Sequence, residues 1–434
     1  MKRKNLAQQV KQRLIEQSLQ RKLKNAENIS TDNTSAKDKY TDFTQHSSYR
    51  QIAIFRHGAE QLGLDNPFFR VHDGRAGALT DINGQRYINF SSYNYLGLSG
   101  DPRVNNAVID AVARYGTSVS ASRMVSGERA IHRELELALA ETYQVDDALV
   151  FVSGHATNVS TISYLMGSKD LIVHDELIHN SITMGAQLSG AKRLAFAHND
   201  MAALEHILQQ QRSNYERVLV VVEGIYSMDG DYPDLPELVR IKQTYASWLM
   251  VDEAHSFGVL GERGLGIREH FSLPGDAVDI WMGTLSKSLA SCGGYIAGSQ
   301  PMIDILRNLA PGFLYSVGMP AQLAAPALAA LQILRDEPWR VARLRENSRQ
   351  FLDELVHSGF DTGNAMGYAV VPLITGNSVD AGRMSGRLFE HGINVQPIVY
   401  PAVPEKHARL RFFLSSEHTP EQIKLTIDAL RAVN

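Results

Sequence analysis

The sequence predicts an α/β protein with a large, mostly parallel sheet covered by helices on both faces and a smaller C-terminal α/β domain. Short apolar runs end in polar or glycine residues, at 147–154, 169–175, 217–224 and 247–255. Segments with helical patterning, such as 201–211 and 235–246, lie between such runs. Near-continuous apolar strands that alternate with helices are typical of a parallel sheet that is buried on both faces.

The chain beyond about residue 335 predicts a second mixture of strands and helices. Three strand-like segments stand out in it, at 366–376, 393–401 and 408–415. We therefore expect four parts: residues 1–48 as a basic N-terminal extension and linker, 49–95 as an N-terminal segment, 96–330 as the large domain and 331–434 as the small domain.

The composition is that of an ordinary globular protein. The 434 residues are 44% hydrophobic and 21% charged, and the formal net charge of −4 gives no sign of nucleic-acid binding. A single cysteine excludes an internal disulfide and a zinc site made of cysteines alone, and we expect it to pack as a small apolar residue. No apolar run approaches the ~20 residues of a membrane span, and no signal peptide is recognisable. We expect a cytoplasmic protein.

The first 30 residues differ from the rest of the chain. They carry eight Lys or Arg against two Glu, and apolar residues recur in them at roughly helical spacing. A polar, turn-rich stretch then reads as a linker up to residue 48. Two interpretations stay open: a solvated, partly frayed helix, or an arm that docks an acidic partner such as a carrier protein or a membrane surface.

Polar residues follow the predicted strands where each strand ends. In sheets of this kind, ligands bind at the carboxyl ends of the strands, so these residues are the candidates for a site. In chain order they are Gly154, His155, His179, Ser227, Asp252, His255, Thr284 and Lys287.

This set suits an aromatic, phosphorylated aldehyde held as a Schiff base. A lysine amine at a partly desolvated site becomes nucleophilic, and a carboxylate beside a pyridine nitrogen makes the ring an electron sink. A glycine turn that opens a helix offers backbone amides to a phosphate. Each residue also has a structural interpretation, as a surface lysine, a helix-capping aspartate or a hydrogen-bonded core histidine.

Several motifs resemble those of the pyridoxal-phosphate-dependent α-oxoamine synthases. The most specific are VVEGIYSMDGD at 221–231, VDEAHSFGVLGERGLG at 251–266, and GTLSKS with GGYIAG between 283 and 298. The resemblance runs from about residue 67 to 430. It implies fold type I of the pyridoxal-phosphate (PLP) enzymes, the aspartate-aminotransferase-like transferase fold, pyridoxal 5'-phosphate as cofactor, a homodimer and no metal.

The resemblance also implies a role for each residue around the cofactor. Lys287 would form the Schiff base and later move the α-proton, and Asp252 would pair with the pyridinium nitrogen. His179 would stack on the ring face. His255 and Ser227 would contact the phenolic oxygen of the ring. Lys287, His179, Asp252 and His255 are accordingly the catalytic candidates.

The phosphate and the substrate would be held at either side of the ring. Backbone amides of Gly154 and His155 would bind the phosphate, assisted by Thr284. The substrate side would be formed by Tyr93, Asn94 and Arg411, of which Arg411 would bind the amino-acid carboxylate. One segment departs from the family pattern, because Val317 and Gly318 stand where a Thr or Ser usually reaches the neighbouring subunit's phosphate. Either Tyr315 or Ser316 would substitute, or this contact with the neighbouring subunit's phosphate would be weaker.

The implied reaction joins a small amino acid (serine, alanine or glycine) to an acyl thioester, with loss of CO2, to give an α-aminoketone. The acyl donor is either a coenzyme A thioester or a chain on an acyl carrier protein. Two alternatives remain: another fold-type-I enzyme, an aminotransferase or amino-acid lyase, or a non-catalytic subunit of a heterodimer.

Overall fold

The computed structural model describes residues 40–61, 63 and 65–433, and the chain divides into two compact units, Met1–Asn66 and Pro67–Asn434. In the first unit, Asp42 caps the short helix η2 (Phe43–Gln45), and helix α3 (Ser47–Gln61) follows. The helical pattern predicted for the first 30 residues lies outside the described part of the chain. Residues 28–48, predicted as a linker, hold η2 and the start of α3 within their described part.

A seven-stranded, mostly parallel sheet forms the centre of the second unit. Its strands, in spatial order, are β4 (Asp147–Phe151), β10 (Gly294–Gly298), β9 (Ile280–Thr284), β8 (Trp248–Asp252), β7 (Val218–Glu223), β5 (Leu171–Asp175) and β6 (Lys192–Phe196). Only β10 runs antiparallel to its two neighbours, so β4, β5, β7, β8 and β9 all end at the same edge. The predicted parallel sheet is confirmed.

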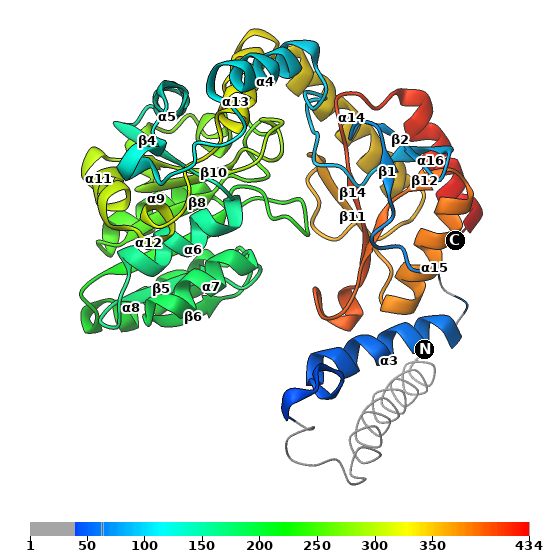
Figure 1. Ribbon diagram of the computed structural model, residues 1–434. Coiled ribbons are helices and arrows are strands. Elements are labelled where there is room, and N and C mark those ends of the chain that lie inside the picture. Colours follow the sequence, from blue (N-terminus) through cyan, green and yellow to red (C-terminus); the bar gives the residue numbers. More distant parts are fainter. Residues whose placement is uncertain (1–39, 62, 64, 434) are drawn as a thin grey trace. The chain divides into compact units, whose positions relative to one another are not determined.

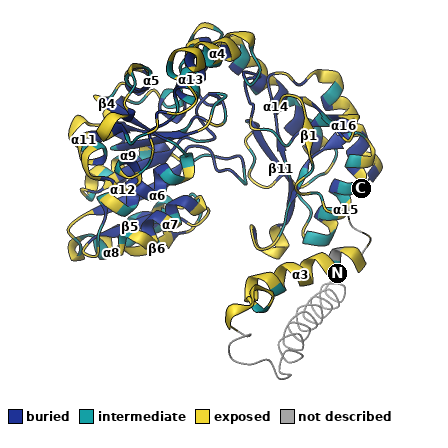
Figure 2. Ribbon diagram, viewed as in Figure 1, coloured by how far each residue is buried: buried dark blue, intermediate teal, exposed yellow. Residues whose placement is uncertain are grey.

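Successive residues of a strand point to opposite faces of the sheet, and in these strands both sets are apolar. Helices therefore cover both faces. Leu219 and Val221 of β7 pack in the same cluster as residues of α6, α7 and α11, whereas Val220 packs in the cluster that α5, α8, α9 and α13 share. The strands are buried between these two helical layers (Figures 1 and 2). The bounds of these helices are α5 (Ala130–Tyr143), α6 (Gly154–Leu165), α7 (Asn180–Ser189), α8 (Met201–Gln211), α9 (Leu235–Thr244), α11 (Gln300–Leu309) and α13 (Ala321–Asp336).

Two smaller sheets join segments that are far apart in the sequence. One has the order β1 (His72–Asp73), β2 (Leu79–Ile82), β3 (Gln85–Asn89) and β12 (Ile393–Asn394); the other has β11 (Val370–Ile374), β14 (Arg409–Phe413) and β13 (Gln396–Ile398). The apolar run predicted at 393–401 therefore splits between two sheets, because β12 pairs with β3 while β13 pairs with β14. Helix α13 runs without a break through position 330–331, where the sequence suggested a domain boundary.

The remaining helices complete the second unit. They are α4 (Pro102–Tyr115), the π-helical turn η3 (Arg123–Gly127), η4 (Arg212–Asn214), α10 (Ile267–His270), η5 (Gly275–Ala277), α12 (Pro311–Leu314), α14 (Trp339–His357), α15 (Ser378–Glu390), η6 (Glu405–His407) and α16 (Pro420–Val433). The one cysteine, Cys292, is exposed in this chain, so the expectation that it packs as a small apolar residue is wrong.

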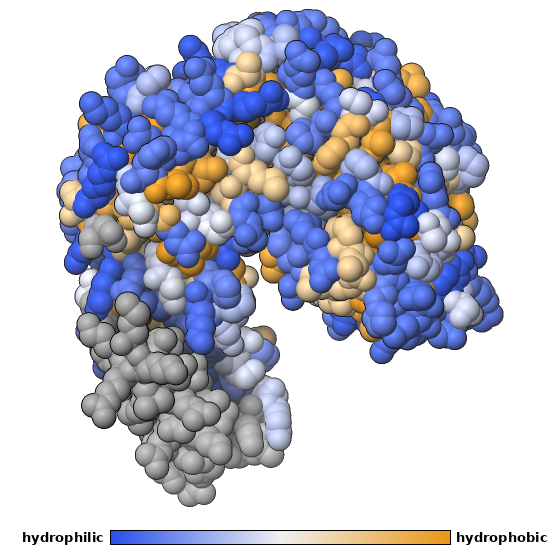
Figure 3. Space-filling model, turned by 180° about the vertical axis from the view of Figure 1, so that it is seen from behind, coloured by the Kyte–Doolittle hydropathy of each residue, from blue (hydrophilic) through white to orange (hydrophobic). Residues whose placement is uncertain are grey.

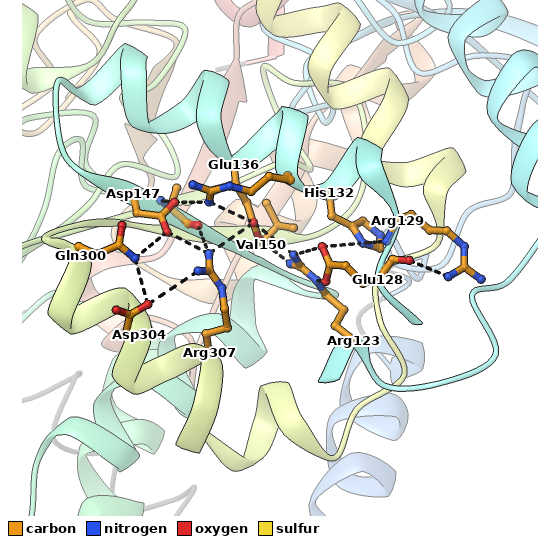
Figure 4. A network of polar contacts seen from close by, with 12 residues as sticks. Arg123, Glu128, Arg129, His132, Glu136, Asp147, Val150, Gln300, Asp304 and Arg307 are labelled. Atoms are coloured by element: carbon orange, nitrogen blue, oxygen red, sulfur yellow. Dashed lines mark hydrogen bonds and ion pairs between the residues drawn. The ribbon is translucent and has the colours of Figure 1, made fainter. Parts of the chain in front are cut away.

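A buried ion-pair network connects β4, α5, α11 and η3 (Figure 4). Glu136 and Asp147 are completely buried. Glu136 accepts hydrogen bonds from the Arg123 guanidinium and from the backbone N–H of Val150, the latter at 3.1 Å. Asp147 pairs with Arg307 at 3.0 Å and with Arg133. Removing one member would leave an uncompensated charge inside the protein.

Glu136→Gln is therefore expected to lower the free energy of unfolding by about 3 kcal/mol, since Arg123 then keeps its buried charge with one fewer counter-ion. Urea titration monitored by circular dichroism measures this difference. The matched control is Glu141→Gln on the same helix, whose exposed pair with Arg335 should be worth less than about 1 kcal/mol. Equal losses in the two variants would contradict the expectation.

Candidate active site

The carboxyl edge of the seven-stranded sheet brings most of the predicted site residues together. Helix α6 begins at Gly154, directly after β4, as the sequence predicted. His179 is the N-cap residue of α7, after β5. Asp252 is the last residue of β8, and Thr284 is the last residue of β9. The parallel run of these strands explains why residues so distant in sequence share one edge.

Lys287 lies in the turn that follows β9, where the surrounding protein removes water from its amine. This desolvation lowers the pKa of Lys287 to about 8, although the charges of Asp252 and Glu223 act in the opposite direction. Its Nζ lies 5.3 Å from the centroid of the Tyr93 ring. An amine with this pKa is partly neutral near pH 7 and can act as a nucleophile or a base.

The glycines after Lys287 let β10 approach the start of α6 closely. A Cβ added to Gly294 would lie 2.5 Å from Thr157 Oγ1 and 2.7 Å from Gly154 Cα. Real side-chain contacts are never this short, so only glycine fits at this position. The run of small residues thereby fixes the position of the helix end that carries Gly154.

Asp252 is buried at the end of β8, and each of its two oxygens accepts one hydrogen bond within the chain. Its Oδ1 accepts the backbone N–H of Ala254 at 3.0 Å, and its Oδ2 accepts Nδ2 of Asn158 at 2.8 Å. Asn158 lies one helical turn after Gly154, and its own Oδ1 is buried with no partner among the described residues. No role was predicted for Asn158, although its spacing of four residues from Gly154 places both on one face of α6.

Glu223 is a second buried carboxyl group at this edge for which no role was predicted. It is paired in register with Asp252 on the neighbouring strand. Its Oε2 accepts the backbone N–H of Ser227 at 3.1 Å, whereas Oε1 is buried without a partner among the described residues. Burial, and then the charge of Asp252, raise the pKa of Glu223 well above its usual value.

Glu223→Gln is expected to remove a pH dependence of stability. A glutamate whose pKa is raised on folding holds its proton more tightly in the fold than in the unfolded chain, so the fold loses stability as the pH rises above the ordinary pKa of about 4.5. The stability of Glu223→Gln relative to the native protein should therefore increase as the pH is raised from 5 to 7. Urea midpoints at both pH values test this, with the exposed Glu216→Gln as control. A difference that does not change with pH would contradict it.

The surrounding protein desolvates both histidines predicted as catalytic, His179 and His255. His255 is buried, and its Nδ1 lies 2.7 Å from the hydroxyl of Tyr95. Burial, and then the charge of Lys287, hold the pKa of His255 well below its usual value, so it is neutral. His179 is partly open to solvent, yet desolvation by the surrounding protein also lowers its pKa.

Arg411 of β14 reaches the loop that follows β7. Its Nη1 donates to the carbonyl of Ser227 at 3.0 Å, while its buried Nε has no partner among the described residues. Arg409, two residues earlier and hence on the same face of β14, donates to the carbonyl of Met228 at 2.8 Å and to Asp229 at 2.7 Å. The unpartnered Nε leaves Arg411 able to donate a hydrogen bond to a bound anionic group.

Of the other two residues predicted to form the substrate side, Tyr93 lies beside the site and Asn94 makes its contacts within the fold. The Tyr93 ring contacts His255 and Phe413, with centroids 5.9 and 4.7 Å apart. Asn94 is buried; its Nδ2 donates to the carbonyl of Ala76 at 2.8 Å and its Oδ1 accepts the N–H of Ser99 at 3.0 Å. With both polar atoms occupied, Asn94 shapes the turn that carries Tyr93.

The residues around the start of α6 fit a phosphate group. Gly154 leaves open the space beside Thr284, because an added Cβ would lie 3.0 Å from Thr284 Oγ1. The first amides of this 12-residue helix carry the positive end of its dipole. The Thr284 hydroxyl itself donates to the carbonyl of Gly293 at 3.0 Å. Together with the aromatic neighbours and the carboxylate of Asp252, these features fit pyridoxal 5'-phosphate.

The segment that departs from the family pattern has a packing reason for one of its residues. The N–H of Gly318 donates to the carbonyl of Ala121 at 3.0 Å, and a Cβ at Gly318 would lie 2.8 Å from Cγ of Arg123. Ser or Thr at this position would therefore collide with the buried Arg123. Tyr315 and Val317 are 87% and 52% exposed in this chain, so both side chains are accessible.

A parallel sheet with a desolvated lysine after one strand and a carboxylate at the end of the next defines a fold-type-I PLP-dependent transferase. The sequence matches the family described as "Aminotransferase class I and II" over residues 85–430. It is 39% identical to 8-amino-7-oxononanoate synthase of Symbiobacterium thermophilum, over 87% of this chain and 95% of that protein.

Two solved structures extend this comparison. Serine palmitoyltransferase from S. paucimobilis, solved with bound PLP and myriocin, is 29% identical, with 90% of this chain and 98% of that chain covered and a TM-score of 0.86. The 8-amino-7-oxononanoate synthase of Francisella tularensis is 27% identical, covers 80% of this chain and 97% of its own, and has a TM-score of 0.70. The chain belongs to the α-oxoamine synthases, a family of PLP-dependent acyltransferases, within the class I and II aminotransferase family.

Two further observations concern what the described residues lack. No helix among residues 40–61 and 65–433 is long and apolar enough to cross a membrane, and the face seen in Figure 3 is largely hydrophilic, with apolar patches between. In the same part of the chain, no group of three or more His, Cys, Asp or Glu side chains could hold a metal ion.

Proposed function

We propose that this enzyme condenses a small amino acid (alanine, serine or glycine) with an acyl thioester and releases CO2, a free thiol and an α-aminoketone. The observation that carries the proposal is the placement of Lys287, Asp252 and Arg411 around one edge of the sheet. The name 8-amino-7-oxononanoate describes an α-aminoketone with a methyl group on the aminated carbon, which is what alanine leaves after losing CO2. The structural relatives named serine palmitoyltransferase support serine.

The cofactor and the residues of the chain divide the chemistry between them. Bound pyridoxal phosphate supplies an aromatic ring that accepts the electron pair left when a bond to the α-carbon breaks. Asp252 holds a proton at the pyridine nitrogen, which strengthens this electron withdrawal. Arg411 binds the carboxylate of the amino acid, and the Lys287 amine removes the α-proton as a general base. A histidine beside the thioester carbonyl, His179 or His255, stabilises the charge that develops on its oxygen.

A screen of amino acids against the purified holoenzyme tests the proposal. Absorbance of the bound cofactor is recorded with each amino acid, with and without an acyl thioester, and CO2 and free thiol are measured. We expect one small amino acid to change the spectrum alone, and CO2 to appear only when the thioester is added. Formation of a keto acid without CO2 would instead indicate an aminotransferase, the activity after which the wider family is named.

We propose that the enzyme is a cytoplasmic homodimer whose acyl donor is bound to a carrier protein. The support for the carrier is the excess of Lys and Arg in the first 30 residues, which suits an acidic partner.

Deletion of residues 1–48 is therefore expected to lower kcat/KM for a carrier-bound thioester about 10-fold, with little effect on the coenzyme A thioester of the same chain. The difference should shrink as salt is raised from 0.05 to about 0.5 M, because exposed charges are then screened. Steady-state kinetics with both donors measure this, and equal losses with the two donors would remove the carrier from the proposal.

A further inference from the structure

A continuous chain of hydrogen bonds connects Asp252 to His179 through two buried residues that have no assigned role. Asn158 donates from Nδ2 both to Asp252 Oδ2, at 2.8 Å, and to Ser181 Oγ, at 2.9 Å. Ser181 Oγ lies 2.7 Å from Nδ1 of His179. Ser181 is completely buried and Asn158 is 1% exposed, so water does not offer alternative partners.

The donor and acceptor of each of these hydrogen bonds can be assigned by starting from Asp252, whose carboxylate can only accept. A carboxylate oxygen accepts, so the Asn158 amide must turn its NH2 group toward Asp252. The same NH2 group reaches Ser181 Oγ, which therefore accepts from Asn158. The hydroxyl proton of Ser181 is then left for its other neighbour, Nδ1 of His179.

A second donor acts on the same nitrogen of His179. The backbone N–H of Ser181 points at Nδ1 over 3.3 Å, and a backbone amide can only donate. Nδ1 thus faces two donors and presents its lone pair to them. Because a neutral imidazole carries one proton, that proton is on Nε2.

We propose that Asn158 and Ser181 are positioning residues that hold His179 as the neutral tautomer with its proton on Nε2, which makes His179 a hydrogen-bond donor at the site. Among the described residues, no side chain or backbone group hydrogen-bonds Nε2. In the proposed reaction, on which this step rests, its acceptor is the carbonyl oxygen of the acyl thioester. The lone pair of Nδ1 is occupied, so His179 donates and Lys287 is the base.

The charged groups around His179 agree with a neutral ring. Although His179 is open to solvent on one side, desolvation by the surrounding protein has the largest effect on its pKa and lowers it. Asp252 raises the pKa, while Lys287, His155 and Arg411 lower it. The relay, the hydrogen-bond chain from Asp252 through Asn158 and Ser181 to His179, also disfavours the charged ring. A proton on Nδ1 would face the two donors of Ser181.

Nitrogen-15 NMR of the purified holoenzyme labelled with 15N-histidine tests the tautomer directly. The His179 resonances are assigned by their loss in His179→Gln. We expect a protonated Nε2 and an unprotonated Nδ1 between pH 6.5 and 8. A proton on Nδ1 at pH 7, or a doubly protonated ring, would overturn the proposal.

Two variants test the relay, each with an outcome that decides. Ser181→Ala should raise the population of the Nδ1–H tautomer or of the charged ring by several-fold. The control on the same helix is Ser189→Ala, whose hydroxyl donates to the carbonyl of Ala186 outside the relay, and it should leave the His179 spectrum unchanged. If Ser181→Ala does not fold, Asn158→Ala should show the same shift to a smaller extent. An unchanged tautomer population in a folded relay variant would overturn the role of these residues.

Kinetics separate this proposal from the proposed function. Ser181→Ala should lower kcat with the acyl thioester about 10-fold or more and leave KM for the amino acid unchanged, since the lost donor acts on the carbonyl oxygen only. The NMR result needs no substrate, so it holds or fails independently of the reaction. If the native enzyme condenses thioesters but His179 carries its proton on Nδ1, the role of Asn158 and Ser181 is wrong and the proposed function stands. If His179 has the expected tautomer but the protein does not condense thioesters, only the proposed acceptor, the thioester carbonyl, is wrong.

Discussion

Lys287→Ala is expected to abolish condensation, with a fall in kcat/KM of more than about 1,000-fold. General-base catalysis alone contributes roughly 100- to 10,000-fold, and the same amine also holds the cofactor. The pKa of about 8 makes Lys287 suited to both tasks, because it is charged in part and neutral in part near pH 7. Release of CO2 from the amino acid and the absorbance of the bound cofactor are the two measurements.

The control for this variant is Lys169→Ala, an exposed lysine that pairs with Glu216. It should leave CO2 release and absorbance as they are in the native enzyme. Circular dichroism should show that Lys287→Ala is folded, since loss of a buried amine removes a desolvation cost rather than a core contact. CO2 release by Lys287→Ala at the native rate would end the assignment of this residue.

The parallel sheet and its functional edge could be predicted from the sequence because both follow from short-range patterns. Apolar runs such as 217–224 end in a polar or glycine residue at the end of the strand, and a parallel sheet places all such ends at one edge. The positions of Asp252, Thr284 and Lys287 follow directly from this rule. The helix that begins at Gly154 was equally predictable, from a glycine turn after a strand.

Residues that act through register could not be predicted in the same way. Glu223 and Asp252 are neighbours only because β7 and β8 pair at those two positions, and a sequence does not state that register. Asn158 and Ser181 belong to different helices, which pack against each other over one face of the sheet. Their polar side chains looked like ordinary helix residues until the fold placed them between Asp252 and His179.

The pairing of β3 with β12 shows the same limit at the level of the fold. These strands lie about 300 residues apart, and each is too short to reveal its partner by its own pattern. Asn89 and Asn394 are both buried in this pair, and Nδ2 of Asn394 donates to Oδ1 of Asn89 at 3.0 Å. Asparagine favours turns, so neither residue reveals this pairing by its type, although the segment 393–401 was predicted as a strand.

His198→Gln is expected to destabilise the protein by about 4 kcal/mol near pH 6 and to lose most of this effect near pH 10. His198 lies between two buried carboxylates: Nε2 is 2.8 Å from Asp231 and Nδ1 is 3.0 Å from Asp175. Burial opposes its charge, but the hydrogen bonds with Asp175 and Asp231 outweigh burial and raise the pKa of His198 to about 10.

The sign of the pH dependence follows from this raised pKa. A histidine whose pKa rises on folding stabilises the fold fully below its unfolded value of about 6.5, and this stabilisation is lost as pH rises through the folded value of about 10. Urea midpoints of native protein and His198→Gln between pH 6 and 10 measure it. The control is His206→Gln, an exposed histidine on α8, which should show no such trend.

The same substitution should reach the active site through the loop after β7. His198 holds Asp231, whose carbonyl accepts the N–H of Tyr226, the residue before Ser227. The same loop also accepts hydrogen bonds from Arg409 and Arg411 of β14. It is therefore held by two sets of contacts, and His198→Gln removes one of them. KM for the amino acid should therefore rise several-fold in His198→Gln, because the carbonyl that helps to orient Arg411 is no longer fixed. A variant that loses stability as expected but keeps the native KM would show that the arginines alone hold the loop.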